Sequence, residues 1–290
     1  RFCYFYQYIR ISLIKNAFYS LMVDYSQING RREDPRHQDN LFNYGYVGRF
    51  ETNEQPFYQF IEANDTLSTS GFYQNGVVAR DISFTPSDVN SDLASYTSDL
   101  YQFFNESGIP VVTGDQIDAS GGLRNGRTPS TIFNLYDPIG LPFNSYQTFE
   151  QNQFRITGSG SADIGNHAIT LGFEFEQYTE RNFSASPIGL WNVARQLTNG
   201  HIEEFDTSAP SDTLNDFGIF PFFSYDRIIS LNDQATFDRN LRTSLGLNPN
   251  GDDYIYVDAL DPELFELDMF SADELLREGN NRLVSYYGYD

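Results

Sequence analysis

The clearest pattern along the chain is a strict alternation of apolar and polar residues over residues 154–164. The even positions carry Phe, Ile, Gly, Gly, Ala and Ile, whereas every odd position carries a polar side chain. Because successive side chains of a β-strand point to opposite faces, this period of two predicts a long strand with one apolar and one polar face. Gly165 and Asn166 follow as a dipeptide that suits a two-residue hairpin turn. The alternation then resumes, which predicts a second strand and therefore a hairpin.

The turn also fixes how the two strands pair. It places Gly158 opposite Phe173, so that the aromatic ring can lie over a residue without a side chain. It places Arg155 opposite Glu176, which predicts an ion pair. A slip of one residue would move apolar side chains onto the polar face, so the pairing is well specified. We expect strands near residues 152–164 and 167–178.

The length of these strands leaves two interpretations open. They exceed the usual length of about five or six residues in globular sheets and match the roughly 9–11 residues with which a tilted strand crosses a bilayer. A membrane barrel would place the apolar face in lipid, whereas a soluble sandwich would cover that face with a second sheet. In the barrel, the candidate lipid-facing residues are Ile156, Ile169, Leu171, Phe173 and Phe175. The candidate lumen-facing residues are Arg155, Thr157, Thr170, Glu174 and Glu176.

Further strands are predicted on either side of this hairpin. Weaker alternation indicates strands near residues 16–27 and 41–51, and Val284–Tyr289 is expected to begin another. Two long connections, residues 53–150 and 179–285, would leave the strands at the end away from the tight turn, with residues 28–40 as a turn on the short side. Each connection is too long for an ordinary loop of a compact domain. Short turns on one side and long structured loops on the other are typical of outer-membrane barrels.

Both long connections contain signals for helices. Residues 85–88, with the sequence Thr-Pro-Ser-Asp, are expected to open a helix with an apolar face that extends to Phe103. Ser271 and Glu274 have the spacing of a capping box, and Gly279 would end that helix. We therefore expect short helices within long loops.

The composition of the chain argues against nucleic acid as a partner. Its 290 residues carry 40 acidic and 18 basic side chains, a net charge of −22, which repels nucleic acid. The 26 Phe and 20 Tyr residues suit strands and wet surfaces better than a helical core. The chain contains no run of eighteen apolar residues, so no transmembrane helix is predicted. Because the chain begins at Arg1 inside an aromatic-rich stretch, we expect it to be an internal part of a longer protein.

The sequence offers no convincing catalytic or cofactor site. Cys3 is alone, so neither a disulfide framework nor a cysteine-based metal site is predicted. The three histidines lack metal-ligand spacing, and paired acids such as Glu203 and Glu204 are expected by chance in so acidic a chain. Residues 248–253 resemble a calcium loop with its glycine at the wrong position, and they favour a plain turn. The glycine-rich residues 121–127 favour a flexible loop. We predict no enzyme activity, no metal and no cofactor.

Several short stretches together resemble one family. Residues 166–176 resemble the strand that follows a short periplasmic turn in TonB-dependent receptors of the Bacteroidetes and their relatives. Residues 40–50 are similar to another barrel strand of that group. Residues 271–276 and 284–290 look like the end of a long extracellular segment and the strand that follows it. The nearest subgroup has a carboxypeptidase-regulatory-like N-terminal domain and is often called Oar-like.

This resemblance implies a fold, a location and partners. It implies an all-β, antiparallel transmembrane barrel of about 22 strands. Residues 1–290 would be one fragment of this barrel, with long hairpins and with long extracellular loops that contain short helices. It places the chain in the cell outer membrane, in contact with lipid, where the family imports a scarce solute. The plug domain and the segment that contacts the TonB complex are absent from residues 1–290. The TonB complex would therefore supply the energy for import through a region of the protein outside these residues.

Two rival hypotheses remain. A secreted or surface-exposed, aromatic-rich module would grip glycans on Tyr and Phe, and it would require a second sheet over the apolar face of the hairpin. A hydrolase would act through two carboxylates, although nothing singles out which acids those would be. The transported solute, whether a small molecule or an oligomer, is left open.

Overall fold

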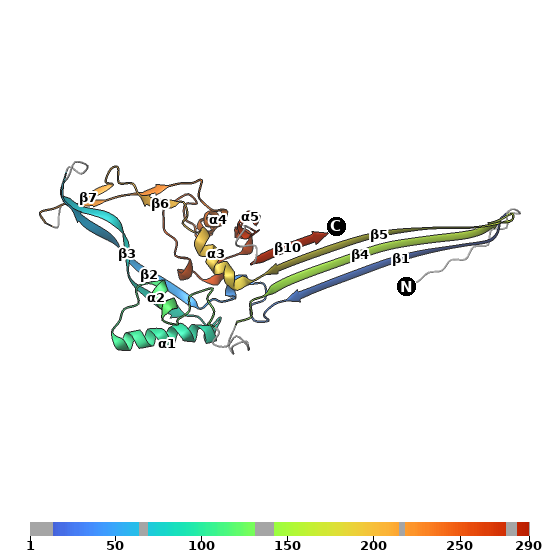
Figure 1. The fold of residues 1–290 in the computed structure, drawn as a ribbon, viewed down its shortest axis with the longest axis horizontal. Coiled ribbons are helices and arrows are strands. Elements are labelled where there is room, and N and C mark those ends of the chain that lie inside the picture. Colours follow the sequence, from blue (N-terminus) through green and yellow to red (C-terminus); the bar gives the residue numbers. More distant parts are fainter. Residues whose placement is uncertain (1–13, 64–68, 131–141, 215–217, 277–282, 290) are drawn as a thin grey trace. The chain divides into compact units, whose positions relative to one another are not determined.

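The computed structural model describes residues 14–63, 69–130, 142–214, 218–276 and 283–289 (Figure 1). The chain divides into two compact units. The sheet unit consists of Arg1–Glu33, Tyr146–Ala185 and Val284–Asp290, of which the described residues form one sheet. The insert unit consists of Asp34–Ser145 and Ser186–Leu283. The chain thus passes between the two units four times.

The sheet unit is a four-stranded antiparallel sheet with the strand order β1-β4-β5-β10. Its strands run side by side in Figure 1. They are β1 (Ile14–Arg32), β4 (Tyr146–Ile164), β5 (His167–Ala185) and β10 (Val284–Tyr289). The predicted hairpin is confirmed together with its register, since Ile164 pairs with His167 and Gly158 with Phe173. Gly165 has φ 61°, the left-handed conformation that the first position of such a turn requires.

The strands of the sheet unit extend further than their alternation predicted. β4 and β5 each contain 19 residues, because polar pairs continue the ladder beyond the apolar stretch. The strand predicted near residues 16–27 is confirmed as β1, which also contains 19 residues. The predicted turn over residues 28–40 is wrong, since β1 continues to Arg32, which lies opposite Gln147 of β4. The chain therefore leaves β1 at the same end as the two long connections.

The insert unit combines two small sheets with helices. One sheet has the order β2-β3-β8-β7, in which β3 and β8 are parallel, and the other pairs β6 with β9. The strands are β2 (Gly48–Ile61), β3 (Gly71–Pro86), β6 (Ile202–Phe205), β7 (Asp212–Leu214), β8 (Phe222–Ser224) and β9 (Arg227–Ile229). The helices are α1 (Ser91–Ser107), α2 (Gly114–Ala119), α3 (Leu190–Leu197), α4 (Thr236–Ser244) and α5 (Ala272–Leu276). Short 3-10 turns cover Leu41–Asn43, Pro187–Gly189, Val257–Ala259, Pro262–Leu264 and Leu267–Met269.

The strand predicted near residues 41–51 is largely wrong. Leu41–Asn43 is a 3-10 turn, and the strand begins only at Gly48. The alternating aromatic residues face a helical core instead: Phe42 stacks on Phe265 with ring centroids 4.7 Å apart and meets the edge of Trp191 at 5.3 Å. Alternation over so few residues reflected this aromatic cluster and not a pleated strand.

The long connections contain more regular structure than expected. β2 and β3 form a long hairpin, most of which lies within residues 53–150, where only a loop with helices was predicted. The predicted helix starts later than residues 85–88, because Pro86 still belongs to β3 and α1 begins at Ser91. The capping box of α5 is confirmed: the Ser271 amide donates to Glu274 Oε2 at 2.7 Å, and the Glu274 amide donates to Ser271 Oγ at 3.3 Å. Gly279 lies outside the described residues.

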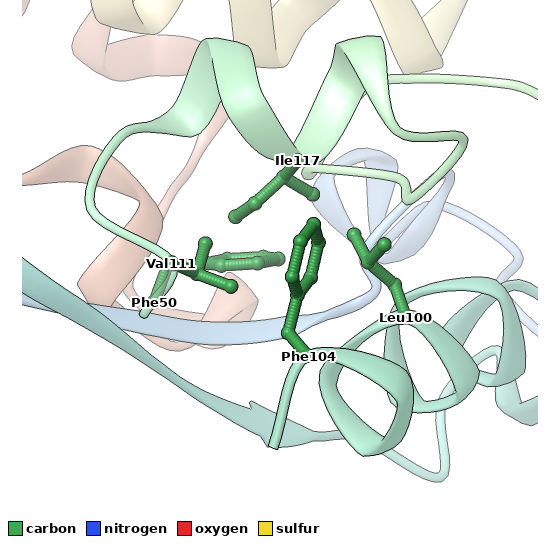
Figure 2. Close-up of a cluster of buried hydrophobic side chains, with 5 residues drawn as sticks. All are labelled: Phe50, Leu100, Phe104, Val111 and Ile117. Atoms are coloured by element: carbon green, nitrogen blue, oxygen red, sulfur yellow. The ribbon is translucent and has the colours of Figure 1, made fainter. Parts of the chain in front are cut away.

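The hydrophobic core of the insert unit joins β2 to α1 and α2. Phe50, Leu100, Phe104, Val111 and Ile117 converge in one buried cluster (Figure 2). Their side chains come from a strand, two helices and the segment between those helices, so no single element can form the cluster alone. Burial of side chains of this size contributes about 1.5–3 kcal/mol each, which makes this cluster a main source of stability for the unit.

Candidate functional site

The two faces of the sheet unit differ as the alternation predicted. Residues directly opposite each other in the ladder share a face. On one face the pairing gathers apolar side chains from three strands: Tyr19, Leu21, Val23 and Tyr25 of β1, Phe154, Ile156 and Ile164 of β4, and Ile169, Leu171, Phe173 and Phe175 of β5. We call this set the apolar band. Leu171 is 73% exposed and Phe173 is 61% exposed, so nothing in the described chain covers the middle of the band.

The apolar band occupies only part of the strands. On β4 it covers residues 154–164, which corresponds to about 34 Å along a strand. Beyond Phe154, toward the end away from the turn, the same face continues with Asn152 and then Glu150, which lies opposite Arg181 of β5. This face therefore changes from apolar to polar and charged about halfway along the strands.

The opposite face is mostly polar and hydrogen-bonded across the strands, although Phe18 and Met22 of β1 also lie on it. Ser20 and Ser159 share a hydrogen bond of 2.7 Å, and Gln153 donates to Glu176 at 2.5 Å. Arg155 lies opposite Glu176 in the register, as predicted, but the predicted ion pair between them is wrong. Arg155 instead pairs with Asp24 of β1 at 3.4 Å, because β1 supplies a carboxylate on its other side. The predicted lumen-facing residues thus lie together on this face.

Gly158 supports the close approach of a ring across the hairpin. A Cβ atom at this position would lie 2.3 Å from the Phe173 ring, so the ring occupies the space that a side chain would need. The predicted contact of Phe173 with Gly158 is therefore confirmed. The predicted lipid-facing residues all lie on the face of the apolar band: Ile156, Ile169, Leu171, Phe173 and Phe175.

The sheet is open within the described chain. β1 pairs only with β4, and β10 pairs only with β5, so each presents one edge without a ladder partner there. Unpaired edges of long strands readily take up further strands. The antiparallel sheet is thus established, whereas barrel closure is not seen among the described residues.

A second candidate site is a cleft in the insert unit. Its volume is about 360 Å³, within the range of small-molecule pockets. Its lining contains both apolar and charged side chains. These come from β2, from β3, from the segment around α2, from α3 and from residues 254–258. The residues that matter for its chemistry are Phe50, Glu54, Ile82, Arg124, Arg195, Tyr254, Tyr256 and Asp258.

Two guanidinium groups line this cleft, and carboxylates hold both. Arg195 Nη1 donates to Asp258 at 2.7 Å. Burial lowers the pKa of Arg195, and the charges of Arg124 and Arg127 add to this effect. Burial also raises the pKa of Asp258, although Arg195 and Arg124 oppose the rise. Arg124 donates to Asp118 through Nε at 3.1 Å and through Nη2 at 2.5 Å. The wall of the cleft is therefore a partly desolvated cluster of opposite charges.

Two tyrosines complete the rim of the cleft. The rings of Tyr254 and Tyr256 lie 5.0 Å apart, and Tyr254 is 58% exposed. Burial raises the pKa of Tyr256, and its hydrogen bond with Glu54 raises it further. The rim thus offers an aromatic surface beside polar groups, the combination with which proteins orient small organic ligands.

The sequence did not point to this cleft. Arg124 lies within residues 121–127, for which a flexible loop was predicted, yet that loop is held by hydrogen bonds. Thr97 Oγ1 accepts from the Leu123 amide at 2.8 Å, and the fully buried Asn125 accepts from the Val47 amide at 2.8 Å. In the sequence, the only signal for this anchoring was the presence of polar residues, such as Asn125, within the glycine-rich segment.

The most deeply buried charges lie elsewhere in the insert unit. Asp238 accepts from Arg242 Nε at 2.9 Å, and both side chains are fully buried. His201 is also fully buried, with Nε2 2.9 Å from the carbonyl oxygen of Gly251 and Nδ1 3.3 Å from Asp238. Because no atom of this cluster faces an opening, it stabilises the fold and offers no access to a substrate.

Comparisons with known proteins leave the family open. No protein-family model matches the chain, and neither a curated protein nor a solved structure matches it. In the described part of the chain, no helix combines the length and the apolar character needed to cross a membrane. No group of three or more His, Cys, Asp or Glu side chains there is placed to hold a metal ion.

Proposed function

We propose that the sheet unit forms part of the wall of an outer-membrane β-barrel of the TonB-dependent receptor type, and that the insert unit is its extracellular part. The protein would take part in the uptake of a scarce solute and would not act as an enzyme. The observation that carries this proposal is the exposed apolar band, which is continuous over three paired strands.

The dimensions of the band fit a bilayer. A strand segment of about 34 Å that tilts by about 40° rises by about 26 Å, close to the apolar height of about 25 Å in outer-membrane barrels. On β4 and β5 the opposite face of this segment carries Ser, Thr, Glu and Arg side chains, which suit a water-filled lumen. A soluble sheet without a second sheet over this face would leave these same apolar side chains in water, which monomeric soluble proteins avoid over large contiguous areas.

The connections support the same proposal. A two-residue turn joins β4 to β5 at one end, whereas all passages into the insert unit leave the strands at the other end. Barrels of this membrane have short periplasmic turns and long extracellular loops. Outer-membrane lipid and the TonB complex would be the partners, and the negative charge disfavours nucleic acid.

Site-specific labelling in outer membranes tests this proposal. We would express the protein with Cys3 replaced by Ser, introduce Leu171→Cys or Thr170→Cys, and attach an environment-sensitive fluorophore. These two positions are neighbours in sequence but lie on opposite faces of β5. We expect a lipid-attached quencher to act on the label at residue 171 and a water-soluble quencher to act on the label at residue 170.

The alternative result is equally informative. If the aqueous quencher reaches both labels and the lipid quencher reaches neither, the sheet does not face a bilayer. That result would overturn the barrel proposal and would favour a secreted, aromatic-rich binding module.

A further inference from the structure

The cleft of the insert unit combines two guanidinium groups with an apolar wall. We propose that it binds a small organic acid, whose carboxylate accepts a hydrogen bond from Arg124 beside the fixed charge of Arg195, while its apolar or aromatic body lies against Phe50, Ile82 and Tyr254. This proposal rests on the proposed function only in treating that acid as the imported solute, since binding itself does not depend on a membrane.

A free hydrogen-bond donor, and not an excess of positive charge, favours an anion at this place. Arg124 and Arg195 line the cleft together with Glu54 and Asp258, so the charges of its lining are balanced. Burial lowers the pKa of Arg195, and the charges of Arg124 and Arg127 lower it further, although Asp258 opposes this change. A carboxylate that accepts from Arg124 in this partly desolvated setting would form a charge-assisted hydrogen bond, which is about twice as strong as a neutral one.

Arg124 has donor capacity left for a ligand. Its Nε and Nη2 atoms bond to Asp118, and Nη2 also reaches Asp115 at 3.4 Å. Its Nη1 atom donates to no group in the described chain and lies against Gly114, where an added Cβ would come within 2.2 Å. The missing side chain at residue 114 therefore leaves room for the guanidinium in the cleft. A carboxylate can bond to Nη1 without displacing Asp118.

Arg195 plays a different part from Arg124. Its Nη1 and Nη2 atoms already bond to Asp258 at 2.7 Å, Asn192 at 2.6 Å and the Asn125 carbonyl oxygen at 3.0 Å. These bonds fix the guanidinium in place. We therefore assign Arg124 as the direct donor and Arg195 as a fixed positive charge beside it.

The size and lining of the cleft set the class of acid. A volume of about 360 Å³ lies at the small end of pockets for organic ligands, which excludes a long peptide or a polysaccharide. Apolar residues from β2, β3 and residues 255–257 line the cleft. This wall favours an acid with an apolar body over inorganic phosphate, because phosphate would leave it unused.

A binding experiment with three probes tests the proposal. We would titrate the full chain with benzoate, with benzamide as its neutral analogue, and with inorganic phosphate, and follow binding by NMR chemical shifts. We expect benzoate to bind in the millimolar range and both other probes to bind at least tenfold more weakly. Arg124→Gln should weaken benzoate at least tenfold. Arg127→Gln is the matched control and should leave benzoate binding unchanged, because Arg127 pairs with the same Asp118 at 3.3 Å but does not line the cleft.

A second variant covers the case in which Arg124→Gln does not fold. Ala79→Trp keeps both guanidinium groups and fills the cleft from β3, so it should abolish benzoate binding. Absence of benzoate binding, equal binding of benzamide, or benzoate binding that survives Ala79→Trp would each overturn the proposal. Failure of the lipid-quenching experiment with intact benzoate binding would instead leave an acid-binding protein outside the membrane, so the two proposals fail separately.

Discussion

Phe173→Arg probes the proposed contact with lipid most directly. The apolar band covers residues 154–164 of β4, and its centre is Ser159. Phe173 lies opposite Gly158, only one residue from that centre, and points to the apolar face. Placing a guanidinium at the middle of a bilayer costs about 2–4 kcal/mol on the lipid face of such a barrel. Since about 1.4 kcal/mol is a factor of ten, the folding equilibrium constant should fall by roughly 30- to 700-fold.

Two matched variants give this prediction its direction and depth. Thr170→Arg lies near the same level but on the polar face, opposite Ser161, and should cost less than about 1 kcal/mol. Tyr286→Arg lies on the same face as Phe173, opposite Phe183 and beyond the band, and should cost about 0–1 kcal/mol. The three costs therefore separate the face of the sheet from the depth in the membrane.

Urea titration of the protein folded in phospholipid vesicles measures these costs. The expected order of destabilisation is Phe173→Arg first, with Thr170→Arg and Tyr286→Arg both close to the parent protein. Equal tolerance at residues 170 and 173 would refute the assignment of the two faces. Equal losses at residues 173 and 286 would refute a bilayer of limited thickness around the band.

Three further predictions concern the insert unit, each measured by urea titration. Asn125→Ala strands a buried backbone amide and carbonyl and should lower the free energy of unfolding by about 2–4 kcal/mol, so an unchanged midpoint would contradict its anchoring role. Glu274→Ala removes the acceptor of the Thr236 amide as well as the cap of α5, and it should lower the free energy of unfolding by about 2–3 kcal/mol. Glu274→Asp should recover little of this loss, because its shorter side chain cannot reach both helices. For Asp34, burial raises the pKa, but hydrogen bonds and the charge of Arg36 outweigh it and hold the pKa below its usual value. Asp34 therefore adds stability above its unfolded pKa of about 4 and loses that contribution as the pH falls through its folded value. Asp34→Asn should thus destabilise the protein at about pH 7 and not at about pH 2, and an equal loss at both would contradict this reading.

The sequence predicted those parts of the fold that depend on neighbours along the chain. The β4–β5 hairpin follows from a period of two on both sides of a turn, so its register could be written down before the structure was known. The β2–β3 hairpin escaped prediction because bulges on β3, at Asn75 and Arg80, shift its register. Each bulge moves the following side chains to the other face, which removes the alternation that indicates a strand.

The cleft could not be predicted for a different reason. Its charged wall joins Glu54 of β2, Arg124, Arg195 of α3 and Asp258, four positions spread over about two hundred residues. In the sequence each of them is one charged residue among many. Only the fold brings them together, and the same fold determines which of the many carboxylates are buried enough to hold a guanidinium.

The four passages between the units carry a consequence for folding kinetics. Within the insert unit the Ser186 amide donates to the Leu283 carbonyl at 2.6 Å, and the Ile188 amide donates to Asn144 Oδ1 at 3.0 Å. A folded insert unit therefore already holds together the chain ends from which β4, β5 and β10 depart. Closing a flexible loop of about a hundred residues would otherwise cost about 4 kcal/mol of chain entropy. The insert unit acts in this respect as a cross-link does, by making distant strands local to one another. We expect β10 to join the β4–β5 hairpin only after the insert unit has folded, as an effectively short-range step of the kind that sheets complete quickly.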